Sequence, residues 1–399
     1  MSDVCVQDMA TGRRRTNQVR HRPEDLDEWA RSLHRRYGGP IAVALELSKG
    51  PIVSVLQKYD LFVLFPIDPS MLANHRKTFT PSGAKDDPTD AELALKLLLT
   101  HSEHFKPLHP QSVEMRTLMI LVEQRRKLMH DRVRITNRLR NALKQYYPQT
   151  LEWFDHIDTP LFCDFVRRWP SLPQARRARR TTLETFFREH NMNRKALLQR
   201  RIQAIKSAMP LTKDEAVIVP YRLQALTLVA QLEVALESIK TYDEEIAALV
   251  PQHPDHRLFT VLPGAGPSLT PRLMVAFGEQ RERYACAAEV QMYGGIAPVT
   301  KRSGQSTWIH WRWQCPTFLR QTFVEWAAQT IKKSYWAGLY YHQQRAKGCS
   351  HQAAVRALAF KWIRILYRCW KTRTPYDEAR YLKALQNRGS PLLKMAETA

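Results

Sequence analysis

The sequence has few cysteines and no hydrophobic run long enough to cross a bilayer. Its six cysteines are scattered without a Cys-x-x-Cys pair, which excludes a zinc ribbon and gives no sign of a disulfide scaffold. The N-terminus lacks the basic start, apolar stretch and small-residue cleavage site of a signal peptide. There is no repeat of fixed period and no low-complexity tract. We therefore expect a protein of the reducing cytoplasm with no role in a membrane.

Acidic residues are also scarce relative to basic ones. The chain has 61 Lys and Arg against 38 Asp and Glu, a formal charge of +23. Such a surface attracts a polyanion, because binding releases counterions condensed on it. With 399 residues, 44% of them hydrophobic, the chain is long enough for two or three domains with a substantial core. These values predict a globular, nucleoid-associated protein that binds nucleic acid.

The pattern of residues divides the chain into three predicted domains, 1–110, 111–250 and 251–399. In the first, strands alternate with helices, which predicts an α/β layer structure. The second contains two long amphipathic runs, expected to pair as an antiparallel coil or to dimerise with another chain. The third is mostly helical and rich in aromatics, most of them assigned to its core and a minority to stacking on unpaired bases. The predicted strands are 4–7, 41–46 and 61–65, and the predicted helices are 23–37, 51–59, 111–147 and 221–250.

Basic residues concentrate on one face of the first long helix and again in residues 167–206. The latter stretch has twelve Lys or Arg against two Glu. So dense an excess of one charge would repel itself unless an anion neutralised it, which favours phosphate contact over a merely solvated helix face. The residues assigned to nucleic-acid binding here are Arg125, Arg126, Arg134, Arg138, Arg176, Arg177, Arg179 and Arg180.

Three acidic residues have the character of metal ligands. Glu46 ends an apolar run, and Asp87 and Asp90 open a predicted helix, where residues three apart project from one face. Mg²⁺, or Mn²⁺ in its place, prefers carboxylate oxygens, so the three side chains are candidates for a metal site close to phosphate. The alternative is that Glu46 ends a core strand and the aspartates cap a helix. The dispersed His104, His109 and His130 do not have the spacing of a zinc site.

Two turn segments in the last third carry further candidates. In Leu-Pro-Gly-Ala-Gly-Pro at 262–267, Gly264 and Gly266 would let backbone N–H groups approach a phosphate at a helix N-terminus, although any tight turn between helices uses such residues. In Lys-Arg-Ser-Gly at 301–304, Ser303 has an accessible hydroxyl beside glycine. Lys301 and Arg302 could stabilise a phosphoryl transition state there, or the segment is a plain turn.

Taken together, these motifs resemble the DEDD-type insertion-sequence transposases, a family of bridge-RNA-guided serine recombinases. Ala-Leu-Glu-Leu-Ser-Lys-Gly around Glu46 and Lys85-Asp-Asp-Pro-Thr-Asp-Ala91 resemble the acidic motifs of the family's RuvC-like domain. The segments at 262–267, 294–298 (Gly-Gly-Ile-Ala-Pro) and 303–304 (Ser-Gly) are similar, in that order, to its transposase domain. The resemblance implies a ribonuclease-H-type N-terminal domain, a long-helix coiled-coil region and a mostly helical C-terminal domain.

By the same resemblance, Ser303 is the nucleophile and Glu46, Asp87 and Asp90 bind the metal. The implied partners are DNA, as element ends and target, a structured guide RNA, and further copies of the chain in a homodimer or homotetramer. The sequence departs from the family at its start, where Ser2 to Asp8 correspond to the second strand. The first strand, with its Gly-x-Asp acid, has no counterpart. An upstream start or a decayed element would each account for this.

Three activities therefore stay open. The leading hypothesis is a transposase that exchanges DNA strands through a phosphoserine intermediate. A Holliday-junction-type nuclease would use metal and water, with Ser303 only a turn residue. An inactive remnant would bind nucleic acid through its basic helices without chemistry.

Overall fold

In the computed structural model, residues 1–46, 49–79 and 86–394 are described. They group into two compact units. Met1–Ser112 and Glu279–Pro316 form the first, and Val113–Gly278 and Thr317–Ala399 form the second. Each unit is described by itself. The grouping places residues 279–316 with the N-terminal segment, whereas the three-domain division remains a prediction.

The first unit begins with a β-hairpin. Strands β1 (Ser2–Gln7) and β2 (Arg14–Val19) pair antiparallel, with Ser2 opposite Val19. In the turn between them, the Asp8 carboxylate accepts hydrogen bonds from the N–H groups of Ala10 and Thr11, at 2.9 and 3.2 Å. The strand predicted at 4–7 is confirmed. Strand β2 was not predicted, because five of its six residues are polar or charged in the pattern Arg-Arg-Thr-Asn-Gln and carry no apolar alternation.

A parallel strand pair follows the hairpin. Strands β3 (Ile41–Leu45) and β4 (Phe62–Pro66) lie parallel and are connected through helix α2 (Pro51–Leu56), the crossover that parallel pairing requires. Helix α1 (Pro23–Tyr37) precedes them, and Gly38 caps its C-terminus in a left-handed conformation, with a φ of 63°. Buried residues of α1, α2 and β4 form one core, Ala30, Leu33, Val53, Leu56, Phe62 and Leu64.

The four strands form two separate pairs in the described residues, so the α/β layer is mixed and its sheets are small. Two further helices complete the segment, α3 (Pro69–Phe79) and α4 (Asp87–Thr100), followed by the short 3-10 helix η1 (Ser102–His104). Helix α4 lies against both β1 and β3.

The rest of the first unit comes from residues 279–316. It contains η3 (Arg281–Arg283), α14 (Ala287–Tyr293) and an antiparallel hairpin of β5 (Val299–Ser303) and β6 (Ser306–His310). Lys106 Nζ donates to Glu289 Oε2 at 2.9 Å, and Ser112 Oγ donates to Glu279 Oε1 at 2.6 Å. These contacts attach the segment to the end of the N-terminal segment.

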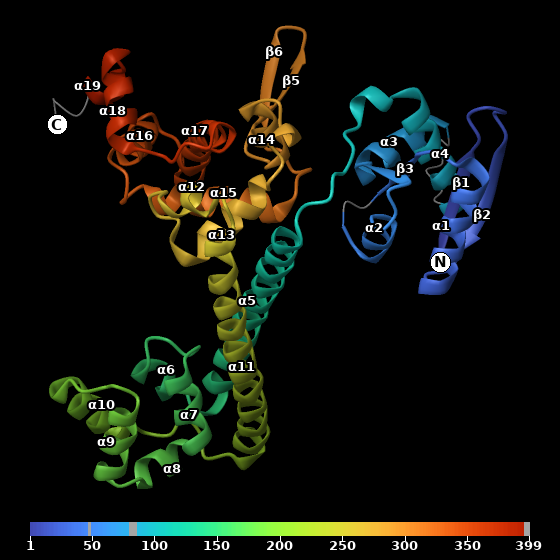
Figure 1. Cartoon of the computed structure of the whole chain (residues 1–399). Helices are drawn as coiled ribbons and strands as arrows, with labels where there is room; N and C mark the ends of the chain where they lie inside the picture. The colour runs from blue at the N-terminus through green and yellow to red at the C-terminus, as the bar shows by residue number, and fades with distance from the viewer. Residues whose placement is uncertain (47–48, 80–85, 395–399) are drawn as a thin grey trace. The chain divides into compact units, whose positions relative to one another are not determined.

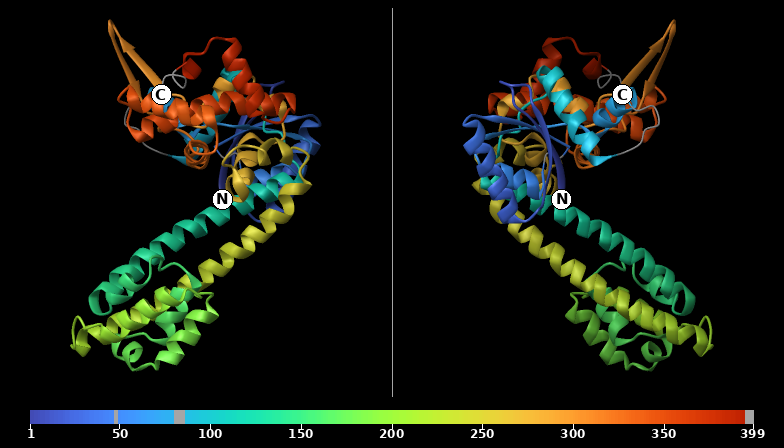
Figure 2. Two further views of the ribbon diagram at one scale, coloured as in Figure 1. Left: turned by 90° about the vertical axis from the view of Figure 1, so that its left-hand side faces the viewer. Right: turned by 90° about the vertical axis from the view of Figure 1, so that its right-hand side faces the viewer.

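The second unit is organised around two long antiparallel helices (Figure 1), which stay side by side in both turned views of Figure 2. Helices α5 (Val113–Tyr146) and α11 (Glu215–Leu249) have 34 and 35 residues, so each is about 50 Å long. The prediction of two long helices is confirmed, and of the two expected arrangements the described residues show the helices paired within the chain. Helix α11 begins six residues earlier than predicted, because the Asp214 side chain caps it and Pro220 is accommodated inside it.

Between α5 and α11 lies a set of short helices, which we call the helical insertion (residues 149–208). Its helices are α6 (Gln149–Trp153), α7 (Pro160–Arg168), α8 (Leu172–Arg177), α9 (Arg180–Glu189) and α10 (Lys195–Ser207). Aromatic side chains fill its core, among them Phe162, Phe165 and Phe187, each 0% exposed. The basic stretch predicted from the sequence is therefore the surface of a folded subdomain.

The C-terminal part of the second unit is helical, as predicted. Four of its tryptophans are fully buried, and each donates its indole N–H to an acceptor: Trp326 to Pro263 O, Trp336 to Tyr376 Oη, Trp362 to Thr330 Oγ1 and Trp370 to Gly278 O. Across the described ranges, no helix is both long and apolar enough to cross a bilayer. The elements are η2 (Val250–Gln252), α12 (His256–Thr260), α13 (Gly266–Phe277), α15 (Thr317–Thr330), α16 (Tyr335–Ala346), α17 (His351–Thr372), α18 (Glu378–Asn387) and α19 (Pro391–Lys394).

Candidate active site and nucleic-acid interface

Ser303 is the last residue of β5 and lies at the tip of an exposed hairpin. Its partner across the hairpin is Ser306, and the two residues between them form the turn. Gly304 adopts a φ of +55°, a left-handed conformation that a residue with a side chain seldom takes. The turn therefore holds the Ser303 side chain at the surface, where its hydroxyl is accessible to a large substrate.

The pleat of the hairpin sorts the neighbours of Ser303 onto two faces. Successive strand residues point to opposite sides, so Lys301 shares the face of Ser303 and Arg302 lies on the other. Trp308, which is 50% exposed, pairs across from Lys301 and belongs to the Ser303 face. Lys301 and Arg302, which were predicted to act together, therefore lie on opposite faces of the hairpin. The face with the Ser303 hydroxyl also carries the Lys301 ammonium and the Trp308 indole.

The predicted metal ligands lie at the end of β3 and the start of α4. Glu46 directly follows β3 and is exposed, and Asp87 is exposed in the first turn of α4. Ala44 of β3 packs in one core with Leu93 and Leu97 of α4, which joins the strand that leads to Glu46 to the helix that carries the aspartates. Lys85, Leu47 and Ser48, which belong to the same motifs, lie outside the described residues.

Asp90 has a partner that the sequence did not reveal. It is 8% exposed, and its two carboxylate oxygens accept from Nε and Nη2 of Arg76 in α3, at 2.6 and 2.5 Å. This bidentate geometry is the strongest form of the Arg–carboxylate pair. Arg76 lies fourteen residues before Asp90 in a segment without a recognisable motif, so only the packing of α3 on α4 identifies it.

The donor set fits a divalent metal in part. Glu46 and Asp87 offer exposed carboxylates of the type a hard cation prefers, whereas Asp90 could contribute only after leaving Arg76. The ligand oxygens of these three residues do not all lie within 4.8 Å of one another. Within the described ranges that criterion is met by the exposed group His101, Glu103 and His104, which sequence reasoning did not single out as a set.

The basic residues predicted on α5 divide by their contacts. The Arg125 guanidinium donates to both carboxylate oxygens of Asp243 in α11, and the Arg126 guanidinium lies 5.5 Å from the Phe318 ring centroid. Burial lowers the pKa of Arg126. These two arginines thus hold the second unit together. Arg134 and Arg138 are exposed on the helix and remain available to a partner, although Arg134 also donates to Asp131.

The glycine turn before α13 has a packing role. Gly264 has a φ of +72°, and a Cβ there would lie 2.9 Å from the backbone carbon of Gln329 in α15. At Gly266, φ is +54° and the space around a Cβ is open. Of the two glycines predicted to approach phosphate, Gly264 therefore faces protein, and Gly266 is the one with free space at its surface.

Two family models, both of IS110-type transposases, match separate segments of the chain. A DEDD transposase model of the IS110 type matches residues 1–148, and a model described as transposase, IS116/IS110/IS902 family, matches residues 256–342. Together the two models match more than half of the chain. The match over residues 1–148 includes Glu46, Asp87 and Asp90, and the match over residues 256–342 includes Ser303.

Several relatives match over most of their length. A Streptomyces coelicolor protein named for the mini-circle element IS117 as its transposase is 27% identical over 346 residues, 86% of this chain and 83% of the relative. The 43.6 kDa protein of insertion element IS110 from the same organism is 28% identical over 309 residues, 74% of this chain and 73% of the relative. The chain therefore belongs to the IS110/IS116 family of DEDD transposases.

Proposed function

We propose that this protein moves an insertion sequence by breaking and rejoining DNA through a covalent bond to Ser303. The observation that supports this most is the position of Ser303 at an exposed hairpin tip, on one face with Lys301. The Ser303 hydroxyl would attack phosphorus and form a phosphoserine ester, while the bond to a deoxyribose oxygen breaks and that oxygen leaves as a hydroxyl, so that the proton lost by serine is balanced by the one that the leaving oxygen takes up. Attack by the hydroxyl of another strand would then reverse the reaction and release the serine.

Charge is the main obstacle to this step, because the phosphodiester gains negative charge in the transition state. The Lys301 ammonium, on the same hairpin face as Ser303, would neutralise part of this negative charge. Divalent-metal use is normal in DEDD transposases. Mg²⁺ or Mn²⁺ held by Glu46, Asp87 and Asp90 would supply further neutralisation of the phosphate oxygens. The first unit contains both Ser303 and these acids.

The partners follow from the same proposal. The family acts on DNA, so element ends and target DNA are the substrates, and a structured RNA would select them. A homodimer or homotetramer would bring two DNA ends together. Exposed apolar residues on the long helices, such as Val133 and Val234 at 54% and 69% exposure, are available for such assembly.

A covalent protein–DNA species tests the proposal. The full chain would be incubated with Mg²⁺, guide RNA and labelled element and target DNA, and the adduct detected by a shift on a denaturing gel. Ser303→Ala should abolish the adduct, and its hairpin partner variant Ser306→Ala should retain it. An adduct that persists in Ser303→Ala would show that another group is the nucleophile. Free 5′-phosphate ends without any adduct would support metal-and-water hydrolysis instead.

A second candidate function, binding without chemistry, is favoured by one observation. Arg76 already neutralises Asp90, so one predicted ligand carries no free charge for a metal. In that case salt-dependent DNA binding would be normal, and neither adduct nor cleavage would form with Mg²⁺ or Mn²⁺.

A further inference from the structure

The basic residues of the helical insertion separate into two classes. Four have partners inside the second unit. Arg167 pairs with Glu233, the Arg168 guanidinium lies 5.0 Å from the Trp169 ring centroid, Arg201 lies 4.8 Å from that of Phe154, and Lys206 donates to backbone carbonyls. Burial lowers the pKa of Arg201, in keeping with its place among aromatic rings. These four maintain the fold of the insertion.

The second class is exposed and includes a cluster at the junction of α8 and α9. Arg176 and Arg177 end α8, Arg179 is the N-cap of α9 and Arg180 is its first residue, so four guanidinium groups occur within five residues. All four are exposed. None of them pairs with a described acidic side chain. We call Arg176–Arg180 the arginine turn.

Lys206 fixes the backbone of this turn. Its ammonium, at the end of α10, donates to the carbonyl oxygen of Arg176 at 2.5 Å and also to that of Ala178. These carbonyls lie at the C-terminus of α8, where backbone acceptors have no helical partner and the helix dipole favours a cation. Because its N–H groups point at the protein, Lys206 holds the turn without itself presenting its charge outward.

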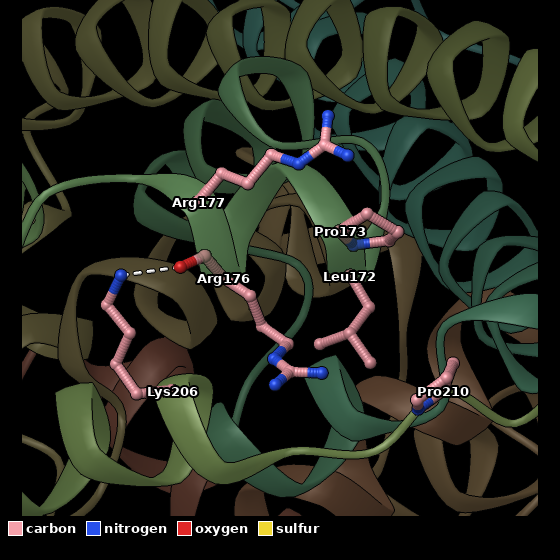
Figure 3. Close-up of a pocket in the computed structure, with 6 residues that line it drawn as sticks. All are labelled: Leu172, Pro173, Arg176, Arg177, Lys206 and Pro210. Carbon is pink, nitrogen blue, oxygen red and sulfur yellow. Dashed lines mark hydrogen bonds between the residues drawn. The ribbon is translucent and has the colours of Figure 1, made fainter.

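The surface beside the turn is hollowed. A shallow pocket of about 360 Å³ is lined by Leu172, Pro173, Arg176, Arg177, Lys206 and Pro210. Figure 3 shows the side chains of Arg176 and Arg177 leaving α8 in different directions, with the Lys206 ammonium directed at the Arg176 carbonyl. Guanidinium groups spread in this way suit successive phosphates along a strand better than one small anion.

The buried aromatics of the insertion decide between paired and unpaired nucleic acid. Binding to unpaired bases relies on exposed aromatic rings on which the bases stack. Every Phe and Trp of residues 149–208 is buried, and this fully described segment has no Tyr. What it offers is positive charge for a sugar–phosphate backbone, which is how proteins hold a duplex without reading its bases. The buried aromatics are Trp153, Phe154, Phe162, Phe165, Trp169, Phe186 and Phe187.

We propose that the helical insertion is a duplex-DNA binding module that contacts phosphates through the arginine turn, with Lys206 as the positioning residue. The choice of DNA over another polyanion rests on the proposed function. The contact is independent of sequence and separate from the residues assigned to chemistry, so it would hold element or target DNA during the reaction without selecting it.

The test compares two full-length variants of equal charge. One is the triple variant Arg176→Ala, Arg177→Ala and Arg179→Ala. Its control is Arg188→Ala, Arg194→Ala and Lys195→Ala, which removes three exposed charges at the end of α9 and the start of α10. Lys195 lies about 16 Å from Lys206 along α10. Binding to a labelled 30-base-pair duplex would be measured by fluorescence anisotropy over a series of salt concentrations.

The arginine-turn variant should lose roughly tenfold or more in affinity, and its plot of log K against log salt should flatten by about 0.9 for each lost phosphate contact. The control should change little. Equal losses in both variants would mean diffuse attraction and would overturn the proposal. It would equally be overturned if single-stranded DNA or duplex RNA bound as tightly through the same arginines.

Lys206 is tested by Lys206→Met, which keeps the aliphatic chain, and Lys206→Arg, which keeps the charge. If Lys206 only added one charge, Lys206→Met would flatten the salt slope by about 0.9 at most. A positioning role predicts a larger change, with recovery in Lys206→Arg, while circular dichroism shows both variants folded. An unchanged slope in folded Lys206→Met would remove the positioning role.

The result of the duplex-binding experiment can be distinguished from the result of the adduct experiment that tests the proposed function. The duplex-binding measurement involves neither the adduct nor added Mg²⁺, so its result does not depend on whether Ser303 is the nucleophile. If the adduct experiment fails and the arginine-turn variant still loses binding, only the chemistry is wrong. If the adduct forms but the arginine turn makes no difference, only the binding module is wrong.

Discussion

At the scale of the residue, the pairing of Asp90 with Arg76 decides more about the candidate metal site than the acidic motif does. The side chains are only 11% and 12% exposed, so each neutralises a charge that has little access to water. A buried charge that loses its partner is costly, whereas removal of both partners is much less so. A metal ion that reaches Asp90 must therefore compete with a guanidinium already in place.

This competition predicts the behaviour of Arg76→Gln. Without added metal, the variant should unfold at lower temperature, with a loss of about 3 kcal/mol, because the Asp90 carboxylate remains unpaired. Mg²⁺ should raise its melting temperature more than that of the unaltered protein, because binding to the folded state stabilises it and the carboxylate is now free to bind. Scanning calorimetry or a dye-based melt with increasing Mg²⁺ measures both effects.

Asp90→Asn in the Arg76→Gln background is the matched control. It removes the free carboxylate, so the loss of stability should be smaller and the extra response to Mg²⁺ should vanish. If Arg76→Gln responds to Mg²⁺ no more than the unaltered protein, Asp90 is a structural ion-pair residue and not a metal ligand.

At the scale of the element, the helical insertion depends on its attachment to the long helices. Arg132 of α5 donates to Asp158 Oδ2 from Nε at 2.9 Å and from Nη2 at 2.5 Å, across the loop that leads into α7. Burial opposes ionisation of Asp158, but the hydrogen bonds and charge of Arg132 outweigh it and lower its pKa below the ordinary value of 3.8. The pair ties the loop between α6 and α7 of the insertion to α5.

Because the folded pKa of Asp158 is below the unfolded one, its contribution to stability is complete above about pH 3.8 and is lost as the pH falls through the folded pKa. Asp158→Asn should therefore cost about 1 kcal/mol at neutral pH, and the difference from the unaltered protein should shrink below about pH 3.8. Denaturant unfolding at several pH values checks this. The exposed Asp155→Asn should show no such difference, and a gap that stays constant down to pH 2 would contradict the assignment.

The elements also differ in how far sequence could predict them. The long helices α5 and α11 have sustained apolar spacing over more than thirty residues, so the pattern identified them, whereas it left open whether they pair with each other or with another chain. Strand β2 is polar and takes its structure from its ladder with β1, and α3 carries no periodic signal strong enough to separate it from a loop. Local pattern fails where an element is stabilised by a neighbour instead of its own amphipathic face.

At the scale of the whole molecule, the two units have cores of very different size. The first unit has small clusters around Leu64 and Leu72, whereas the second contains a large aromatic and aliphatic core from Leu139 to Leu232. Each of these clusters lies within one unit. Since stability rises with the apolar surface that a core buries, we expect the units to differ in stability.

Calorimetry should then show two transitions, with the first unit unfolding at the lower temperature and a total enthalpy above the van't Hoff value. Leu64→Ala, at a site 2% exposed, should lower only the first transition, and Leu232→Ala, at a site 0% exposed, only the second. A single transition that both substitutions shift equally would show that the chain unfolds as one cooperative body.

The sequence by itself determined the features that depend on charge, local periodicity and linear motifs. These are the excess of positive charge, the two long helices, the aromatic core of the last third, and the positions of the acidic and serine motifs. Each depends on residue type and on neighbours within a few positions, which the linear order contains in full.

Only the tertiary structure decided which of these residues are free to act. It placed Arg76 on Asp90, joined Arg125 to Asp243, packed Gly264 against Gln329, and turned Lys206 inward while Arg176 and Arg177 remained at the surface. These contacts join residues between 14 and more than 100 positions apart. The reason is physical, because the availability of a charge depends on which group lies within hydrogen-bond distance after folding, and packing sets that distance.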